Sequence, residues 1–429
     1  MSELFQANLD IIRRRWPDIA EQLAEITPEM IDRLEPVLIQ GRQQTIAVCG
    51  KQLSSRHDRD REATHLLQHI PGGLDRVLIF GMGLGDVPAL ALSRWTDRPI
   101  ELCLMSMPIT AMVLNYTNQT EWLSAPNLTL RRPRWTDCYA GPWTAIIPEL
   151  QLADPDLARV RDHLVMTLQR PFVDLQHQLA EKNNASRIEQ TLTLLQTLPN
   201  VATLFTRKNP RAIVIGAGPS LERAYEWLYA GQQAPERPSL IAADTAHKAL
   251  TSHGIVPDIV VTMDARINAA HLNTETSADS TLVCFPSTNP EVIRAWQGPR
   301  MAALTKSPTQ DKYVDRLPCN RLFSGGSVIH PALDIAVQCG ATEIILCGCD
   351  FGFPEGKSHA YWQDGALGVT HDNAGHTVEN YHGQNIATTL NMRGYLLAVE
   401  LFIKRHPNVR FFNHAGMGAS ISDCPVREC

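Results

Sequence analysis

The sequence predicts an α/β protein whose C-terminal half holds a mostly parallel sheet with helices on both faces, preceded by a smaller α/β domain. Two observations carry this prediction. After residue 206, short apolar runs alternate with helical repeats, and a separate apolar run at residues 75–86 leads into alternating glycines and a further helix. Strands that alternate with helices need crossover connections, which place the strands parallel in one sheet. A strand, a glycine turn and a helix form the start of a Rossmann-like unit.

Length and composition agree with two soluble globular domains. The chain has 429 residues, which is more than one hydrophobic core usually serves. Hydrophobic residues make up 44% and charged residues 20%, as is ordinary for a protein with a buried core. The net charge of -6 argues against a large nucleic-acid surface. Short basic runs such as Arg13–Arg15 are therefore interpreted as solvated faces, and no nucleic-acid partner is expected.

Export and membrane insertion are not expected. The N-terminal stretch MSELFQANLDIIRRRW lacks the uninterrupted apolar core of a signal peptide. The most apolar later stretch, Val77–Trp95, is broken by glycines, Asp86 and Pro88. The ten cysteines include no CxxC pair and are interpreted as buried free thiols of a reducing compartment. We therefore expect a cytoplasmic protein without a membrane span.

The first domain is expected to span residues 1–155. After leading helices, one of them over Leu4–Ile26, come the segment DRVLIFGMGLGD and an apolar helix at Val87–Trp95. A dinucleotide or adenosyl site of this type places an acid at the end of the next strand to hold the ribose hydroxyls. Here that strand, IELCLMSM, ends in Ser106 and Met107. We predict a degenerate Rossmann-like domain kept for support or partner docking, with a working cofactor site as the alternative.

A helical connector is expected over residues 156–205, where leucines recur every three or four positions. The second domain then spans residues 206–429 and carries the predicted parallel sheet. A helix is expected from about Ser327 to Cys339, before the last predicted strand. The predicted strands are AIVIG (212–216), SLIAAD (239–244), DIVVTMD (258–264), TLVCF (281–285) and TEIILCGCD (342–350).

The turn GAGPS at Gly216–Ser220, after the first of these strands, is the first candidate binding element. Leu221 stands where a dinucleotide fingerprint needs its third glycine, and the Gly-Lys-Ser/Thr ending of a Walker A loop is absent. Two glycines nevertheless allow a ligand to approach closely, and Pro219 suits the first turn of a helix. Free N–H groups at such a turn favour an anion such as a phosphate. The alternative is a tight connection that lets the helix pack closely.

Acids and a second glycine pair are expected at the same edge of the sheet. Asp244, Asp264 and Asp350 each close a predicted strand, and the carboxyl ends of parallel strands line the ligand crevice in open α/β sheets. Each acid has a structural alternative as a helix cap or turn residue. The segment Gly325–Ser327 precedes a predicted helix and offers a second backbone platform for a nucleotide.

A histidine follows in the loop CGCDFGFPEGKSHAYW, which brings His359 back toward the end of the last predicted strand. Because this loop is rooted in the predicted crevice, His359 is a candidate for catalysis, with a structural histidine as the alternative. His371, His376 and His382 have spacings unlike those of known histidine metal motifs, so no metal site is predicted.

Taken together, these motifs resemble the motility accessory factor family, also called the DUF115 or MptE-like family. The matching segments are GAGPSL (216–221), AADTAHKAL (242–250), PDIVVTMDA (257–265), GGSV (325–328), CGCDFGF with GKSHA (347–360) and GMGASISDC (416–424). They occur in the expected order over roughly residues 205–424, and DRVLIFGMGLGD is similar to the N-terminal domain of that family. The resemblance implies a sialyltransferase-like fold for the second domain.

Bacterial members of this family are similar to sialyltransferases that use CMP-activated sugars. The resemblance implies a glycosyltransferase that moves a nonulosonic, sialic-acid-like sugar from a CMP donor to Ser or Thr of flagellin. The expected partners are the nucleotide-activated sugar and flagellin, with no metal and no tightly bound cofactor. Motility factors often carry a further helical region after the GMGASISDC segment, in the place where flagellin would bind.

The resemblance also implies roles for individual residues. His359 and Asp350 are the catalytic candidates, with His359 as the general base that takes the proton of the acceptor hydroxyl. Asp244 and Asp264 would bind ribose, cytosine or the acceptor. The residues that would hold the nucleotide phosphate and complete the pocket are Gly216, Gly218, Pro219, Ser220, Gly325, Gly326 and Ser327.

Two alternatives stay open. Archaeal relatives are 6-hydroxymethyl-7,8-dihydropterin diphosphokinases, which transfer pyrophosphate from ATP and would need Mg²⁺. These enzymes resemble the second domain alone, whereas motility factors carry a domain ahead of it, which favours the transferase. The other alternative is a non-enzymatic flagellin chaperone or assembly factor with a vestigial nucleotide fold, because a fold does not establish a function.

Overall fold

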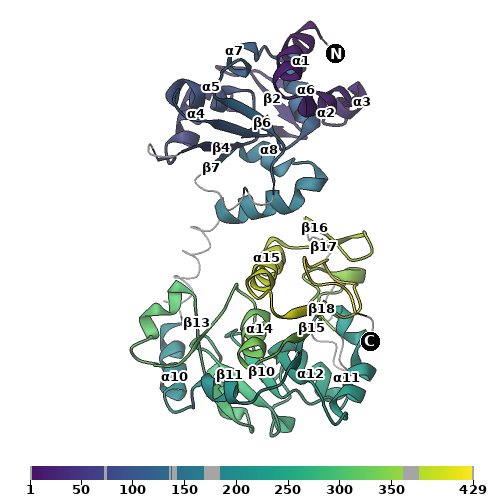
Figure 1. Ribbon diagram of the computed structural model, residues 1–429. Helices are drawn as coiled ribbons and strands as arrows, with labels where there is room; N and C mark the ends of the chain where they lie inside the picture. Colours follow the sequence, from purple (N-terminus) through teal and green to yellow (C-terminus); the bar gives the residue numbers. More distant parts are fainter. Residues whose placement is uncertain are drawn as a thin grey trace. The chain divides into compact units, whose positions relative to one another are not determined.

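Two compact units make up the chain. The computed structural model describes residues 2–71, 75–134, 137, 143–168, 184–360 and 376–427. The units are Met1–Gln169 and Arg170–Cys429, and each is built around its own parallel sheet (Figure 1). This is the α/β fold class that the alternating apolar runs predict. None of the helices in the described ranges is long and apolar enough to cross a membrane.

The first unit contains a four-stranded sheet in the order β6-β5-β4-β7, and all neighbouring strands are parallel. Every residue of β4 is buried, which explains why its sequence is a continuous apolar run. The chain leaves β4 toward β5 and β6 and later returns to the other side of β4, so the strand order reverses between β4 and β7. The strands are β4 (Val77–Phe80), β5 (Ile100–Cys103), β6 (Leu128–Arg131) and β7 (Trp143–Ala145).

Helices and a small antiparallel sheet complete the first unit. The single helix expected over residues 4–26 is wrong, because Pro17 cannot continue a helix but suits the start of one. The helices are α1 (Glu3–Arg15), α2 (Pro17–Ala24), α3 (Pro28–Asp32), α4 (Arg59–Leu67), α5 (Asp86–Arg94), α6 (Met107–Tyr116), α7 (Thr120–Leu123) and α8 (Ile147–Gln151). The small sheet consists of β1 (Val37–Ile39), β2 (Thr45–Val48) and β3 (Lys51–Gln52).

The second unit is built on a seven-stranded sheet in the order β12-β11-β10-β9-β8-β15-β18, and every neighbouring pair is parallel. The five strands predicted from the sequence are confirmed as β8, β9, β10, β11 and β15. The edge strands β12 and β18 are short and begin with Arg300 and Arg410, so their apolar runs give too weak a signal. The strands are β8 (Arg211–Ile215), β9 (Ser239–Ala243), β10 (Ile259–Thr262), β11 (Thr281–Cys284), β12 (Arg300–Ala302), β15 (Glu343–Cys347) and β18 (Arg410–Asn413).

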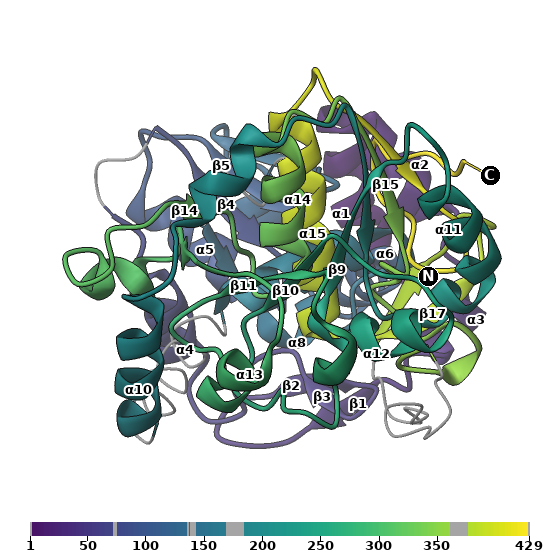
Figure 2. The ribbon, with the colours of Figure 1, turned by 90° about the horizontal axis from the view of Figure 1, so that it is seen from below.

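Alternate side chains of these strands pack against two helical layers. In Figure 2, α14 and α15 lie on one side of β9 and β15, and α11 lies on the other. Val214 and Ile241 pack in one cluster with residues of α14 and α15, whereas Ile213 and Leu240 pack in another with residues of α11 and α12. Residues of α10 and α13 cluster with β10 and β11. The helices are α10 (Ala185–Leu195), α11 (Tyr225–Gln232), α12 (Asp244–Ser252), α13 (Pro290–Ala295), α14 (Ile329–Gln338) and α15 (Leu390–Arg405). Two short pairs lie outside the main sheet: β13 (Leu304–Thr305) with β14 (Arg321–Leu322), and β16 (His376–Glu379) with β17 (Asn385–Thr388).

The strand order of the second unit reverses between β8 and β15, and there two loops meet through glycines. The chain runs from β8 outward to β12 and then returns to β15 on the other side of β8. A Cβ atom on Gly216 would lie 2.4 Å from the carbonyl oxygen of Gly348, and one on Gly348 would lie 2.5 Å from that of Gly216. Gly348 also has a φ of +63°, which favours glycine. The close approach therefore requires glycine at both positions.

We expect Gly216→Ala to destabilise the second unit, because the added methyl group would overlap the Gly348 carbonyl. The expected loss in the free energy of unfolding is about 1–3 kcal/mol, the usual cost of overpacking. Urea denaturation of the full chain measures it. Gly231→Ala is the matched control, since Gly231 lies in α11 with no atom within 4 Å of its Cβ position. That control should gain about 0.5–1 kcal/mol from helix propensity, and equal effects of the two substitutions would contradict the expected overlap.

Candidate functional site

The turn Gly216–Ser220 follows β8 and leads into a short 3-10 helix, η4 (Pro219–Arg223). Backbone hydrogen bonds tie this turn to the end of β15. The Gly216 N–H donates to the Cys347 carbonyl at 2.8 Å, and the Gly218 N–H donates to the Gly348 carbonyl at 2.8 Å. Two of the turn's donors are therefore used by the connection itself, as the structural alternative for this turn expects.

The carboxylate of Asp350 accepts two further hydrogen bonds from the turn. The Ser220 N–H donates to Oδ2 of Asp350 at 2.8 Å, and the Ser220 hydroxyl donates to Oδ1 at 2.5 Å. A Cβ atom on Gly218 would lie 2.4 Å from Oδ2, and one on Gly418 would lie 2.6 Å from Oδ1, so glycines on two loops leave the space for this carboxylate. Asp350 thus acts as an anion that the chain itself supplies to the turn.

Asp350 is only 5% exposed. Burial raises its pKa to about 6, and the hydroxyl and N–H of Ser220 act against burial by stabilising the charged form. The group therefore changes its charge just below neutral pH, which matters for any anion that approaches the turn.

The second glycine platform, Gly325–Ser327, is filled by an imidazole. The N–H groups of Gly325 and Ser327 both donate to Nδ1 of His330 at 3.1 Å, and Nε2 of the ring lies 3.0 Å from the Tyr395 carbonyl. A ring nitrogen that accepts hydrogen bonds carries no proton, so His330 is neutral with its proton on Nε2. Burial lowers the pKa of His330 to about 4, which agrees with this state. Gly326, with a φ of +99°, lies against the Tyr395 ring.

Asp244 begins α12 directly after β9 and is 2% exposed. Its Oδ1 accepts a hydrogen bond from the Thr245 N–H at 2.8 Å. Its Oδ2 and the hydroxyl of Thr262 are both buried without a hydrogen-bond partner in the part of the chain that the structure describes. Burial raises the pKa of Asp244 to about 6, against the effect of the nearby Thr262 hydroxyl. A buried carboxylate oxygen left without a partner suggests more than a cap.

Asp264 follows β10 and is paired with Arg266. The Arg266 Nη2 lies 2.6 Å from Oδ2 of Asp264, and the Arg266 backbone N–H donates to Oδ1 at 2.8 Å. Burial raises the pKa of Asp264, but the hydrogen bonds and charge of Arg266 outweigh it, so the net pKa is lowered. Burial and the charge of Asp264 raise the pKa of Tyr395. Gly325–Ser327 lead into α14, which is followed by the parallel strand β15, so this platform lies at the carboxyl edge of the sheet, as Asp264 does.

The loop of His359 returns to the first glycine turn. The Ala360 N–H donates to the Ala217 carbonyl at 2.8 Å, and Nδ1 of His359 lies 3.1 Å from the Ser358 hydroxyl. Of the other sequence-predicted histidines, His376 lies in β16, His382 follows it, and His371 lies outside the described residues. Within the described ranges, no group of three or more His, Cys, Asp or Glu side chains is arranged to hold a metal ion.

Part of the chain that forms this site is similar to a known protein family. Residues 183–356 match the family described as 6-hydroxymethylpterin diphosphokinase MptE-like. This segment is therefore similar to the MptE-like family. It contains both the glycine turn and Asp350, so the resemblance predicted from the motifs is confirmed over this part of the chain. No curated protein matches the chain. The chain is also similar to a solved structure of the Maf glycosyltransferase from Magnetospirillum magneticum AMB-1, with a sequence identity of 14% and a TM-score of 0.41. The match covers 99% of this chain and 74% of the other.

The structure gathers the sequence-predicted residues of the second unit into two places. Ser220 and Asp350 meet directly, with the loop of His359 beside them, while Asp244 and Asp264 follow neighbouring strands near the Gly325–Ser327 platform. Residues that sequence reasoning missed are Arg266, His330, Tyr395 and Gly418. His330 follows Ser327 closely enough to have been a candidate, whereas Tyr395 lies 65 residues further along and gives no local signal.

The first unit repeats the arrangement found in the second unit. Its glycine turn follows β4, and the carboxylate of Glu149, in α8 after β7, accepts hydrogen bonds from the N–H groups of Met82 at 2.6 Å and Gly83 at 2.8 Å. Glu149 is fully buried, and burial raises its pKa to about 7. An internal carboxylate thus takes the donors that a ligand phosphate would need, which gives a physical reason for the degenerate character predicted for this domain.

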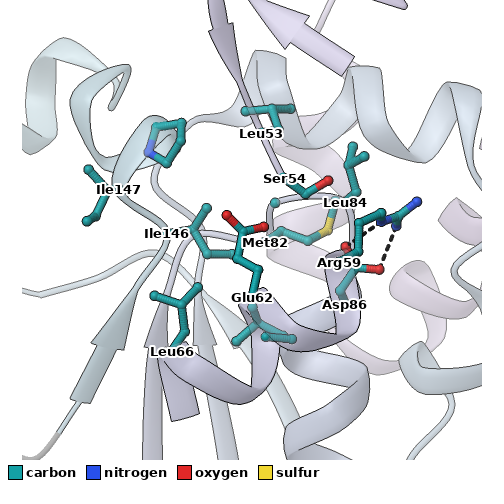
Figure 3. A pocket seen from close by; sticks show the side chains of 14 residues that line it. Leu53, Ser54, Arg59, Glu62, Leu66, Met82, Leu84, Asp86, Ile146 and Ile147 are labelled. Atoms are coloured by element: carbon teal, nitrogen blue, oxygen red, sulfur yellow. Dashed lines mark hydrogen bonds and ion pairs between the residues drawn. The ribbon is translucent and has the colours of Figure 1, made fainter. Parts of the chain in front are cut away.

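A pocket lies beside this turn, where the strand order of the first sheet reverses (Figure 3). Most of its lining is apolar, and the guanidinium of Arg59 at its wall is held by the carboxylate of Asp86 at 2.6 and 2.9 Å. Near this turn, the N–H groups of Met82 and Gly83 are already bound by Glu149, and the Arg59 guanidinium is already paired with Asp86. Its lining residues are Leu53, Ser54, Arg59, Glu62, Ala63, Leu66, Met82, Gly83, Leu84, Asp86, Val87, Ile146, Ile147 and Pro148.

We expect Glu149→Gln to change how stability depends on pH. In the folded chain Glu149 keeps its proton up to about pH 7, whereas in the unfolded chain it ionises near its ordinary pKa of 4.5. The wild-type chain should therefore lose stability as the pH rises between these two values, by roughly 3 kcal/mol at 1.4 kcal/mol per pH unit. The variant should lack this loss.

Urea denaturation of the full chain at several pH values between about 4.5 and 8 measures the difference. Glu21→Gln, at an exposed position of α2, is the matched control and should follow the wild-type profile. Parallel profiles for wild type and Glu149→Gln would show that Glu149 is charged in the folded chain.

Proposed function

We propose that the chain is a glycosyltransferase that moves a nonulosonic, sialic-acid-like sugar from a CMP donor to a hydroxyl of flagellin. The observation that carries the proposal is the carboxyl edge of the second unit's seven-stranded sheet. The turn Gly216–Ser220, the Asp264–Arg266 pair and the loop of His359 all follow strands at that edge. In open α/β sheets, nucleotides bind at this edge, beside the reversal of strand order. The motif resemblance supports CMP and flagellin as the donor nucleotide and acceptor.

In this proposal the nucleotide phosphate binds at the turn, and Asp244 and Asp264 bind ribose, cytosine or the acceptor. Gly325–Ser327 completes the pocket. The Arg266 side chain is 89% exposed, so its remaining N–H groups are available to the carboxylate that every nonulosonic acid carries. Transfer needs the acceptor hydroxyl to lose its proton, and His359 is the proposed base. The proposed reaction needs no metal ion.

We expect His359→Ala to lower turnover by about 10²- to 10⁴-fold, because a general base typically contributes that much. The Kd for CMP should stay close to the wild-type value, since the proton transfer is made in the transition state. CMP release from the sugar donor measures turnover, and isothermal calorimetry measures the Kd. His57→Ala, at an exposed position of the first unit, is the control and should be fully active. Wild-type turnover in His359→Ala would remove His359 from the mechanism.

A second candidate is a 6-hydroxymethylpterin diphosphokinase, which the family match over residues 183–356 favours. Its ATP substrate would bring Mg²⁺, which proteins commonly hold with one or two carboxylates plus the phosphates of the substrate. Asp244 and Asp264 fit that requirement, since they lie at the ends of neighbouring parallel strands and sense each other's charge. The bound ion would neutralise charge on the phosphates.

A thermal-shift comparison of CMP and CDP with ATP, each with and without Mg²⁺, separates the two candidates. A ligand at 100 times its Kd adds about 2.7 kcal/mol to the stability of the folded state. Stabilisation by cytidine nucleotides in the presence of a chelator supports the transferase. Stabilisation by ATP that occurs only when Mg²⁺ is present supports the diphosphokinase. No shift with any nucleotide, together with flagellin binding that survives substitution of Ser220, Asp264 and His359, supports a non-enzymatic flagellin factor instead.

A further inference from the structure

The two donors of Ser220, its N–H and its hydroxyl, are the strongest anion-binding groups of the first glycine turn, and both are engaged by Asp350. We propose that Asp350 competes with the nucleotide phosphate for these two donors, so that nucleotide binding is accompanied by uptake of one proton at the Asp350 carboxylate. This inference rests on the proposed nucleotide site. It makes Asp350 a residue that controls occupancy of the site rather than one that touches the reacting atoms.

The first step of the argument is the small number of donors left in the turn. The N–H groups of Gly216 and Gly218 bind carbonyl oxygens of the loop after β15, and Pro219 has no N–H. Of residues 216–220, Ala217 alone has an N–H without a hydrogen-bond partner in the described part of the chain. A phosphate that bound there with one hydrogen bond would leave its other oxygens unsatisfied. Firm binding therefore requires the Ser220 donors.

The second step is the confinement of the carboxylate. Glycines at positions 218 and 418 leave just enough room for Asp350, and the Ala419 N–H holds its backbone carbonyl at 2.7 Å. A phosphate oxygen cannot share this space with an ionised carboxylate, because two negative charges a few ångströms apart repel by several kcal/mol at an effective dielectric constant of about 20. Protonation removes the charge and leaves a carboxyl group that can donate a hydrogen bond to the phosphate.

The third step is the charge environment. Ser220, from the turn, is the group that stabilises the ionised form of Asp350, and burial destabilises it. On β15 and its loop, Cys347 and Cys349 are buried thiols, and burial together with the charge of Asp350 keeps Cys349 protonated. Charged or titratable groups within a few residues of the contacting loops are His414 and Asp423 in the sequence around Gly418, and Glu222, Arg223, Lys357 and His359 in the segments of the turn and its partner loop. None of these is among the groups that shift the pKa of Asp350.

Glu149 provides a matched control within the same chain. It makes the same kind of contact with the glycine turn of the first unit, it comes from the same side of a strand-order reversal, and it is also buried with a raised pKa. The proposed nucleotide site does not include that turn. Glu149→Gln should therefore leave nucleotide affinity unchanged, whereas Asp350→Asn should raise it.

The experiment is isothermal calorimetry of the full chain with the methyl ester of CMP, a phosphodiester that carries one negative charge throughout the pH range used. Wild-type protein should bind about tenfold more tightly, or more, near pH 6 than near pH 8. A tenfold change in affinity corresponds to a shift of one unit in the pKa of Asp350 on binding. Asp350→Asn removes the negative charge at every pH and puts an amide NH₂, a hydrogen-bond donor, in place of one carboxylate oxygen. The affinity of this variant should be the same at both pH values. Near pH 8 it should exceed that of wild type by about tenfold.

A second measurement uses wild-type protein alone. Titrations near pH 7 in two buffers with different ionisation enthalpies should reveal uptake of close to one proton per nucleotide. Absence of uptake, or an Asp350→Asn affinity that equals or falls below that of wild type near pH 8, overturns the competition while leaving the nucleotide site in place. No binding by any variant at either pH overturns the proposed function and the competition together. A tighter Glu149→Gln variant would also overturn the assignment to Asp350.

Discussion

The hydrogen bonds between Asp350 and Ser220 hold together the part of the chain on which the candidate site depends. They join the loop after β8 to the loop after β15, across 130 residues of sequence and across the reversal of strand order. The glycine pair Gly216 and Gly348 permits this approach, and Gly418 closes the space from a third loop. The turn, the loop of His359 and the GMGAS segment therefore meet around one buried residue, and backbone hydrogen bonds between these loops reinforce the contact.

A buried carboxylate that is hydrogen-bonded to a glycine turn occurs twice in the chain, once beside each of the two parallel sheets. In each unit the carboxylate comes from beyond the strand on the far side of the reversal. Glu149 accepts hydrogen bonds from two N–H groups of its glycine turn, and Asp350 accepts from the N–H and the hydroxyl of Ser220. A buried donor without a partner is costly, so a turn that has no permanent ligand needs an acceptor of its own. Glu149 is fully enclosed and suits a closed turn, whereas Asp350 lies beside other residues of the proposed site.

Much of the architecture follows from local sequence, and much of the site does not. Buried strands such as β8 and β15 are continuous apolar runs, so their positions and their parallel arrangement are predictable. The strand order is not, because nothing near Glu343–Cys347 indicates that it pairs with β8 rather than with β12. For the same reason the glycine turn could be identified, but the Asp350 contact that fills it could not. His330 shows a related limit, since its role depends on a carbonyl of Tyr395 in another helix.

The pairing of β8 with β15 also bears on how the chain is made. During synthesis β8 to β12 emerge first and can form five adjacent strands, but the free edge of β8 has no partner until β15 has left the ribosome. An unpaired edge on an apolar strand invites association with other chains, and long-range parallel pairing forms slowly. An interior strand of the finished sheet, β8, is therefore an edge strand of the nascent one, and this unit depends on being shielded from other chains until its last third is translated.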